Sequence, residues 1–389
     1  MKSVRSRSSS HYSHLVLLLC LMELELFHAA AEDIHTLTPG TVMNDFDYLW
    51  SPNELFRLKF FSVGESSNHY LGIEIIKFEK IVWVANRDNP FEDTSGVLNI
   101  TEDGNLLLSN RHGIRITLNS ESPAMSSNTS AILLDSGNLI LKAGDQIVWQ
   151  SSDHPSDTIL SAMKLRLFAA LNSRQPREHL LTSWISIAIA ASGTFTLGVD
   201  PNKTNQLVIW LRGKLFWQSG NRNGHNFTYF PASGPFNDLE SSNLKFSYIS
   251  NGNGSYYTYS VPPNYISLFA INPTGEVHFF QGGNNKYSIW YLYCNAGEEN
   301  GSKGCIDKKP SKCNSGYQFI QKYGYLESWE HLYNFSLALG DFKDMCINNC
   351  SCKAYGSLQT DGKGCRFSYD QILRYQNLRN LFTCATTAS

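Results

Sequence analysis

The 389-residue sequence has few charged side chains and no excess of either sign. Asp, Glu, Lys and Arg make up 17% of the residues, with 32 Lys and Arg against 34 Asp and Glu, so the formal net charge is −2. Soluble chains ordinarily contain about 25% charged residues. Because the chain lacks a basic excess, it lacks the field that attracts nucleic acids or anionic membranes, and we expect neither as a partner.

After its N-terminal region the sequence has no apolar run of the ~20 residues that a membrane-spanning helix needs. The N-terminus reads as a secretory signal, because Lys2, Arg5 and Arg7 precede an apolar stretch at 15–22 and three alanines follow at 29–31. We predict a signal peptide over 1–31 and a secreted, extracellular chain. Eight Asn-x-Ser/Thr sequons predict N-glycosylation at Asn99, Asn128, Asn202, Asn226, Asn253, Asn300, Asn334 and Asn349.

The short motifs of common catalytic sites are also missing. The sequence has no His-Glu-x-x-His zinc motif, no Gly-x-Ser-x-Gly elbow and no set of kinase motifs, and its 11 His are scattered. We therefore predict that the chain is not an enzyme and uses no cofactor or metal.

Cysteine is absent from the long middle of the chain. Of nine Cys, Cys20 lies in the predicted signal peptide and the others lie between 294 and 384. An even number of Cys crowded at one end of a secreted chain is typical of a disulfide-stapled module. A zinc site is the weaker interpretation, because no His lies at a ligand-like spacing. The eight are Cys294, Cys305, Cys313, Cys346, Cys350, Cys352, Cys365 and Cys384.

The chain does contain a repeat with a period of 33 residues. Ile81-Val82-Trp83 recurs as Ile114-Arg115-Ile116 and as Ile147-Val148-Trp149, and 116 − 83 = 149 − 116 = 33. The stretch 104–108, which follows an Asp-Gly hairpin signal, recurs at 137–141 with the same offset. Such a period predicts strand units that cannot bury an apolar face alone. We expect three small sheets around one axis, with Trp83, Ile116 and Trp149 pointing inward.

The rest of the chain also favours β structure. An early strand is expected at 55–61, and 156–180 reads as a linker. From Leu181 to Trp290 alternating strands follow one another between Gly- and Asn-rich turns. One tyrosine face of the stretch 256–259 should be buried. The Cys-rich end has one helical candidate at 339–349, followed by strands at 353–358 and 365–369. The predicted fold class is therefore mostly β.

Five motifs in order resemble the extracellular part of plant S-domain receptor-like kinases, also called G-type lectin receptor kinases, and their secreted relatives, the S-locus glycoproteins. They are VWVANRDNP (82–90), LLDSGNLIL (133–141), WQSSDHPSDT (149–158), GTFTLGVDPN (193–202) and CINNCSCKAYGS (346–357). The resemblance implies a bulb-type lectin domain of β-prism fold at 32–155, an S-locus glycoprotein-like β domain at 156–292, a cysteine-rich bridge at 293–315, and a disulfide-rich α+β PAN/apple domain with an atypical tail at 316–389.

The resemblance also implies a function. Such ectodomains bind extracellular peptide or protein ligands and pair with related receptors as dimer partners. Receptors of this kind continue into a membrane span and a kinase, so we interpret this chain as truncated before both. The alternative is a soluble lectin that binds mannose-type glycans.

Bulb lectins bind mannose through the pattern Gln-x-Asp-x-Asn-x-Val-x-Tyr on one strand face. The period of 33 places these five positions at 68, 70, 72, 74 and 76, at 101, 103, 105, 107 and 109, and at 134, 136, 138, 140 and 142. Only Asp103, Asn105 and Asn138 keep the pattern's Asp or Asn, so they are the candidate, degenerate sugar-binding residues. The alternative is that they remain as turn residues. Trp83 and Trp149 could stack on a sugar, but Ile116 cannot, so we expect core packing.

The resemblance to apple domains further implies a Cys346–Cys352 disulfide. Those domains carry a Cys where this chain has Phe342, and that Cys would pair with the equivalent of Cys365. Two outcomes stay open for Cys365. It pairs with Cys384, or it is a free, exposed thiol that invites a disulfide-linked dimer. We expect local misfit, which would make the apple domain the least stable part of the chain.

Overall fold

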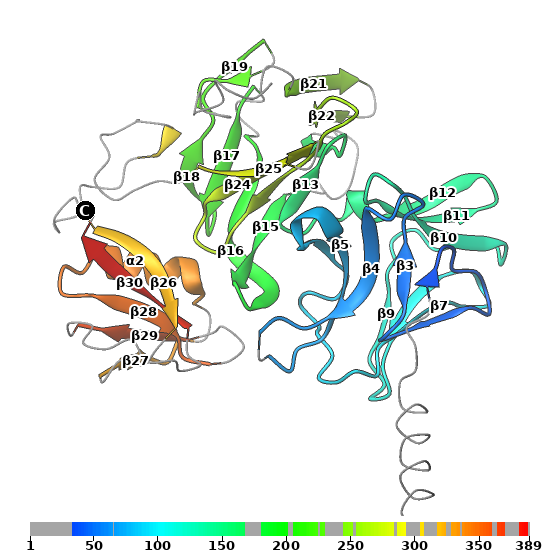
Figure 1. The fold of residues 1–389 in the computed structure, drawn as a ribbon, viewed down its shortest axis with the longest axis horizontal. Helices are drawn as coiled ribbons and strands as arrows, with labels where there is room; N and C mark the ends of the chain where they lie inside the picture. Colours follow the sequence, from blue (N-terminus) through cyan, green and yellow to red (C-terminus); the bar gives the residue numbers. More distant parts are fainter. Residues whose placement is uncertain are drawn as a thin grey trace, which may run out of the picture.

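The computed structural model describes residues 33–64, 66–167, 180–200, 205–224, 226–229, 244–251, 254–283, 286–292, 304–306, 317–323, 328–334, 337–359, 364–369 and 381–387. The predicted signal peptide lies outside these residues, as do Asn202, Asn253, Asn300, Cys294 and Cys313. The described chain is mostly β and forms three modules, coloured from blue and cyan through green and yellow to orange and red (Figure 1).

The first module consists of three sheets. The first sheet, β1-β3-β4-β5-β6, contains β1 (Asp33–Ile34), β3 (Tyr48–Trp50), β4 (Phe56–Phe61), β5 (Tyr70–Ile75) and β6 (Lys80–Val84). The second, β2-β7-β8-β9, contains β2 (Val42–Asn44), β7 (Val97–Ile100), β8 (Leu106–Ser109) and β9 (Arg115–Thr117). The third, β10-β11-β12, contains β10 (Thr129–Leu133), β11 (Leu139–Ala143) and β12 (Gln146–Gln150). The 3-10 turns η1 (Ile76–Phe78) and η2 (Ser151–Asp153) follow β5 and β12.

The apolar faces of these sheets meet in one core, because alternate residues of each strand point to the same side. Trp83 and Trp149 lie in it, each 6% exposed, with ring centroids 6.0 Å apart in an edge-to-face arrangement. Ile116 packs against the same core from β9. The indole N–H of Trp83 donates to the His154 carbonyl at 2.8 Å. The period of 33 thus describes three hairpins whose last strands meet in one core.

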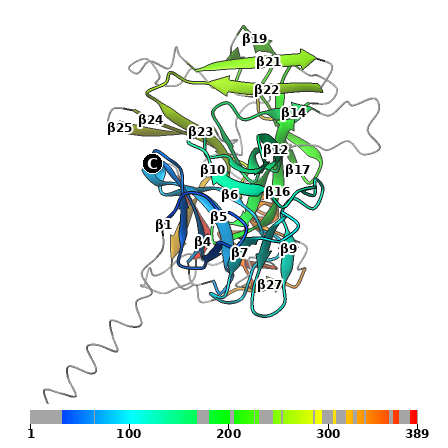
Figure 2. The same cartoon turned by 90° about the vertical axis from the view of Figure 1, so that its right-hand side faces the viewer.

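The second module is built from three further sheets. The sheet β13-β23-β24-β25 contains β13 (Thr158–Leu160), β23 (Ile266–Ile271), β24 (Val277–Gly283) and β25 (Lys286–Leu292). The sheet β14-β22-β21 contains β14 (Leu165–Leu167), β22 (Gly254–Ser260) and β21 (Lys245–Asn251), and lies at the top of the view in Figure 2. The sheet β15-β16-β17-β18 contains β15 (Leu181–Ser186), β16 (Ile189–Val199), β17 (Leu207–Leu211) and β18 (Lys214–Gln218), and β19 (Arg222–Asn223) pairs with β20 (Asn226–Phe227).

Strand β23 joins the two modules. Its Leu268 and Ala270 belong to the first core, whereas Phe269 and Ile271 belong to the second. The predicted linker at 156–180 is therefore wrong for its described part, because β13 and β14 within it pair with β23 and β22. Short strands of three residues leave little periodic signal, and only their distant partners make them strands. Tyr257 and Tyr259 of β22 are buried, so the prediction of one buried tyrosine face is confirmed.

The second module also contains a fourth copy of the hairpin unit. Trp149 pairs with Leu141 and Trp217 with Ile209, so both strands are offset by 68, since 217 − 149 = 209 − 141 = 68. Both hairpins shift register at the same point, after Leu141 and after Ile209. The Ser151 hydroxyl accepts a hydrogen bond from the backbone N–H of Leu139, the first residue of β11, and the Ser219 hydroxyl accepts one from Leu207, the first residue of β17, both at 2.9 Å. The sequence contains a signal of this fourth copy, because Trp-Gln-Ser occurs at both 149–151 and 217–219.

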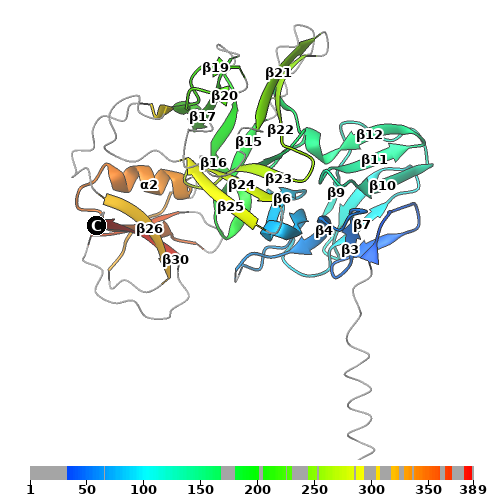
Figure 3. The ribbon, with the colours of Figure 1, turned by 45° about the horizontal axis from the view of Figure 1, so that its top comes forward.

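The C-terminal module consists of one sheet and the helix α2 (Leu339–Ile347), which lies along the sheet in Figure 3. The sheet order is β26-β30-β28-β29-β27, with β26 (Tyr317–Tyr323), β30 (Leu381–Thr387), β28 (Ala354–Ser357), β29 (Cys365–Ser368) and β27 (Glu330–Leu332). The predicted helix and the two predicted strands after it are present. The atypical tail contributes β30, which lies between β26 and β28 in the sheet.

The structure joins Cys346 to Cys352 by a disulfide, with the two Cα atoms 5.3 Å apart. Cys305 and Cys350 are disulfide-bonded as well. Cys365 is free and fully buried, so neither of the two outcomes left open for it, the bond to Cys384 and the exposed thiol, is found. Phe342 is also fully buried and packs in the same small core as Cys365, so an aromatic ring stands where the resemblance to apple domains implied a second Cys. Burial raises the pKa of the Cys365 thiol, which opposes formation of the reactive thiolate.

Two arginines tie the modules together. Arg87, in the loop after β6, donates to the carbonyls of Ala190, Thr182 and Ser183 in the second module at 2.8–3.1 Å. Arg212 donates two hydrogen bonds of 2.7 Å to the carboxylate of Asp341 in α2. The Asp341 carboxylate also accepts a hydrogen bond from the backbone N–H of Ala338. The same side chain therefore caps the N-terminus of α2 and binds Arg212 of the second module.

Candidate functional site

The structure corrects the register of the candidate sugar positions in the first unit. Trp83, Ile116 and Trp149 pair with Ile73, Leu108 and Leu141, so the central strands are offset by 108 − 73 = 35 and 141 − 108 = 33. Four residues separate the paired Ile75 and Lys80, whereas two separate Ala143 and Gln146. The five positions in the first unit are therefore 66, 68, 70, 72 and 74. The predicted set of 68 to 76 is wrong, because the longer turn with η1 inserts two residues.

In the second unit, Asp103 and Asn105 are engaged with the protein itself. The Asn105 side chain donates to Asp103 Oδ2 at 2.8 Å, and its oxygen accepts from the Asn119 side chain and the Ala124 backbone, both at 2.8 Å. Asp103 also accepts a hydrogen bond from the Thr101 hydroxyl, which is the main cause that lowers the pKa of Asp103. These contacts hold the hairpin turn and the loop after β9. They agree with the alternative that Asp103 and Asn105 remain in the sequence as turn residues.

In the third unit, Asn138 is the first member of a chain of hydrogen bonds. Its oxygen accepts from the Ser151 hydroxyl at 3.1 Å and from the Ser152 backbone at 3.0 Å. Its amide nitrogen donates to Gln150 Oε1 at 2.9 Å, and Gln150 in turn donates to Asp153 Oδ2 at 2.9 Å. Asn138 therefore does not meet Asp103 and Asn105, which lie in a different sheet.

A cleft opens beside this chain of hydrogen bonds, and we call it the junction cleft. Its walls come from Val82 and Trp83 of β6, from the turn 136–138, from Gln150 to Asp153, and from Leu160 to Lys164, with Pro155 and Thr158 between them. Its volume is about 190 Å³. Because 160–164 connects β13 to β14, the cleft lies where the first module meets the second. Of the predicted sugar residues, only Asn138 lines it.

The structure also brings together three residues that sequence spacing did not suggest. The Ser62 Oγ lies 2.6 Å from His69 Nδ1, and His69 Nε2 lies 2.8 Å from Asp45 Oδ1. His69 and Asp45 are buried and Ser62 is exposed. The arrangement resembles a catalytic triad, but it lines neither the junction cleft nor the apolar cavity in the second core. It holds the turn after β2 against the ends of β4 and β5.

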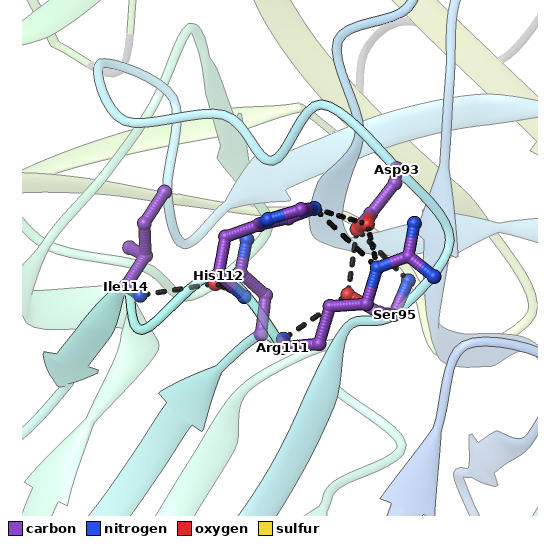
Figure 4. Close-up of polar contacts among 6 residues, drawn as sticks. Asp93, Ser95, Arg111, His112 and Ile114 are labelled. Atoms are coloured by element: carbon purple, nitrogen blue, oxygen red, sulfur yellow. Dashed lines mark hydrogen bonds and ion pairs between the residues drawn. The ribbon is translucent and has the colours of Figure 1, made fainter.

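A second polar cluster lies on the surface at the turn between β8 and β9 (Figure 4). Asp93 accepts from the Ser95 hydroxyl at 2.6 Å and contacts Arg111 Nε at 2.7 Å and His112 Nε2 at 2.8 Å. The Ser95 hydrogen bond is the main cause that lowers the pKa of Asp93 to about 2. Arg111 and His112 are exposed, so this cluster anchors a turn at the surface.

In the described part of the chain, no group of three or more His, Cys, Asp or Glu side chains is arranged to hold a metal ion. Among the same residues, no helix has the length and apolar character that crossing a bilayer requires.

Comparison with known proteins gives a match over most of the chain. Residues 80–185 match the family described as D-mannose binding lectin. Three Arabidopsis thaliana proteins described as G-type lectin S-receptor-like serine/threonine-protein kinases are similar as well. At1g67520 is 30% identical over 87% of this chain and 41% of its own length, CES101 is 31% identical over 85% and 43%, and SD1-1 is 30% identical over 92% and 50%.

The chain thus spans half or less of the length of these relatives. It covers their lectin and S-domain part and does not cover their kinase region. Among solved structures, the two-domain lectin Scilla campanulata agglutinin is 13% identical, with a TM-score of 0.20, over 68% of this chain and 97% of that one. At so low a score the fold is best described from the sheets of this chain.

Proposed function

Because the chain carries a B-lectin domain and is homologous over most of its length to the ectodomains of the G-type lectin S-receptor-like kinases, we propose that it is an extracellular recognition protein that binds a ligand without transforming it. The observation that carries this proposal is the similarity to the lectin and S-domain part of receptors over 87% of the chain. The partners we propose are an extracellular peptide or protein and, as dimer partners, related receptors.

The exposed sequons support an extracellular, glycosylated chain. Asn128, Asn334 and Asn349 are exposed, and Asn99 is half-buried on β7. Disulfides at the C-terminal end support the same compartment, because such bonds persist in oxidising surroundings. The rigid connection of the modules through Arg87 and Arg212 suits a protein that presents one large surface to a partner.

The experiment is expression of the full chain in plant cells. We expect it in the medium, with a mass that falls after enzymatic removal of N-glycans. Asn128→Gln should remove one glycan, whereas Asn105→Gln, which lies outside any sequon, should remove none. The secreted chain is then tested by biolayer interferometry against the ectodomains of CES101 and SD1-1. An unglycosylated chain that stays in the cytosol would contradict the proposal.

A second candidate function is that of a mannose-type lectin that uses the central-strand positions. The family match over residues 80–185 favours it. The geometry disfavours it, because the side chains of Asn105 and Asn138 already hold the protein's own turns. A glycan array with competition by free mannose separates the two functions. Mannose-sensitive binding that Asn105→Ala abolishes, with the fold intact, would favour the lectin.

A further inference from the structure

Arg366, on β29, has no anionic partner among the described residues. Its Nε is buried and has no hydrogen-bond partner. The guanidinium lies over the Trp329 ring, 4.6 Å from the centroid, and an aromatic face attracts the cation without pairing its N–H groups with a carboxylate. Glu330 is the one acidic residue of the neighbouring strand β27, but it lies opposite Phe367 and so points to the other face of the sheet. The guanidinium therefore keeps donors that no carboxylate of the described chain accepts.

A comparison with Arg212 shows what Arg366 lacks. Arg212 donates two hydrogen bonds to the Asp341 carboxylate, and this hydrogen bonding is the main cause that raises the pKa of Arg212. Burial alone lowers the pKa of Arg366, because no anion offsets the loss of water around its charge. A partly buried cation without a partner costs stability, and residues of a binding surface often carry such a cost. Arg366 is thus a candidate for contact with an anion from outside the chain.

Three ring side chains lie beside Arg366 along the edge of the sheet. Strand β27 is the last strand of that sheet and lies at the rim of the C-terminal module (Figure 1). His331 is exposed and lies directly opposite Arg366, so both side chains project from the same side of the sheet. Tyr333 is 70% exposed and contacts His331 edge-to-face, with ring centroids 6.0 Å apart. We call Trp329, His331, Tyr333 and Arg366 together the β27 face.

The β27 face lies on the side of the sheet away from the core of the module. Neighbouring residues of a strand point to opposite faces, and Cys365 and Phe367, on either side of Arg366, join the small core with Phe342 of α2. The four side chains of the β27 face are absent from that core. They are therefore available for contact with a partner.

The composition of the β27 face indicates an acidic, extended peptide. Arg366 can donate two parallel hydrogen bonds to one carboxylate. Its single positive charge matches that group, whereas a phosphate carries about −1.5 to −2 and is bound by clusters of cations. The rings of Trp329 and Tyr333 supply apolar area for the side chains that flank the carboxylate. The β27 face lines neither the junction cleft nor the apolar cavity of the second core, so it suits a chain laid across it and not an enclosed small molecule.

We propose that the β27 face docks an extended, acidic segment of an extracellular partner protein, with a Glu or Asp carboxylate bound to Arg366 and apolar neighbours packed on Trp329 and Tyr333. This inference rests on the proposed recognition function and assigns one of its contacts to the C-terminal module. The face lies outside residues 80–185, which match the lectin family, so the contact requires no sugar.

The test uses the full secreted chain and a set of amidated octapeptides, labelled with a neutral dye, in which one Glu stands among Leu, Pro and Gly residues. A matched set carries Gln in place of Glu, and binding is measured by fluorescence anisotropy. Arg366→Gln removes the cation, and Tyr333→Ser removes an exposed ring outside the core. The control Arg115→Gln makes the same change as Arg366→Gln at an exposed position of β9 in the first module.

We expect the Glu peptides to bind about tenfold more tightly than their Gln counterparts, which corresponds to ~1.4 kcal/mol. Arg366→Gln should remove this difference, whereas Arg115→Gln should keep it. Tyr333→Ser should weaken the binding of both sets, and it keeps the test decisive if Arg366→Gln does not fold.

Equal binding of the Glu and Gln sets, or a folded Arg366→Gln variant that binds as the wild type does, would overturn the site. Dimerisation that Arg366→Gln abolishes would assign the face to a second copy and overturn the proposed peptide. If no peptide binds while the chain still binds a receptor ectodomain, the proposal for the β27 face fails and the recognition function stands. Failure of both would reject the function as well.

Discussion

The hairpins β11–β12 and β17–β18 have the same register and differ in what lies against their last strand. Against β18 lies the segment 304–306, where Cys305 pairs with Trp217 and the Ile306 N–H donates to the Phe216 carbonyl at 3.1 Å. A Cβ on Gly304 would lie 2.0 Å from the Gln218 carbonyl oxygen, so this segment passes directly over the strand. On the hairpin β11–β12, the junction cleft lies beside Gln150 at the end of β12 and beside the turn 136–138.

The polar residue just before β11 and the one just before β17 also have different hydrogen-bond partners. Gln206, the equivalent of Asn138, donates to Asp200 within its own module at 2.9 Å. Asn138 instead orients Gln150 toward the cleft. One hairpin unit thus completes a closed core in the second module and forms a wall of a cleft in the first. The comparison shows that two hairpins of the same register can have different surroundings, because the segments packed against them differ.

The largest expected effect comes from removing the tryptophan common to both hairpins. Trp149→Ala and Trp217→Ala should each lower the free energy of unfolding by ~3–5 kcal/mol, as truncation of a buried aromatic does. Trp217 is 1% exposed and Trp149 6%, so we expect the larger loss for Trp217. Urea unfolding followed by fluorescence measures both. A variant that unfolds like the wild type but loses ligand binding would show that its indole is a surface contact.

Substitution of Gly137, which lines the junction cleft, should have the next largest effect on stability. Gly137 has φ +77°, and a Cβ there would lie 2.6 Å from Leu160 Cδ1. Gly137→Ala should cost about 2–4 kcal/mol, from the left-handed backbone and from overpacking together. Gly144 has φ +57° and no atom within 4 Å of its Cβ position, so Gly144→Ala should cost only the ~1–2 kcal/mol of the backbone term. Equal losses in thermal melts would contradict the close approach of Leu160.

The third prediction concerns Asn105, in the second repeat unit, which does not line the junction cleft. Asn105→Ala removes the acceptor for Asn119 and for the Ala124 N–H, so we expect stability to fall by about 1–3 kcal/mol. Ligand recognition should remain unchanged, because this side chain is engaged with the protein. Binding is compared with the wild type by calorimetry below the melting temperature. A clear loss of binding in the folded variant would place a sugar site in the second unit.

The smallest effect concerns the surface cluster at Asp93, whose contribution to stability should depend on pH. Its pKa is lowered to about 2, against ~3.9 in an unfolded chain, so the ionised form is favoured by folding. The stability it contributes is present above about pH 4 and is lost as the pH falls toward 2. We expect the difference in melting temperature between wild type and Asp93→Asn to shrink over that range. A constant difference from pH 5 to pH 2 would refute the assignment.

The sequence by itself determined the elements whose signal is local or periodic. The period of 33, the inward tryptophans and the β class follow from strand alternation, which each hairpin carries within about a dozen residues. The ordered motifs by themselves already resembled the ectodomains of the G-type lectin S-receptor-like kinases, to which most of the chain is homologous. The predicted domain boundaries, the glycans and the ligand class are still predictions that await experiment.

Only the tertiary structure decided the features that depend on distant partners. The register of the first unit shifted because two extra residues in a turn leave no mark on the pattern. The residues 158–160 and 165–167 became strands because β23 and β22, about a hundred residues later, supply their hydrogen bonds. Cys365 is buried because Phe342 packs beside it. The junction cleft exists because two modules meet there, and no local pattern within either one encodes the space between them.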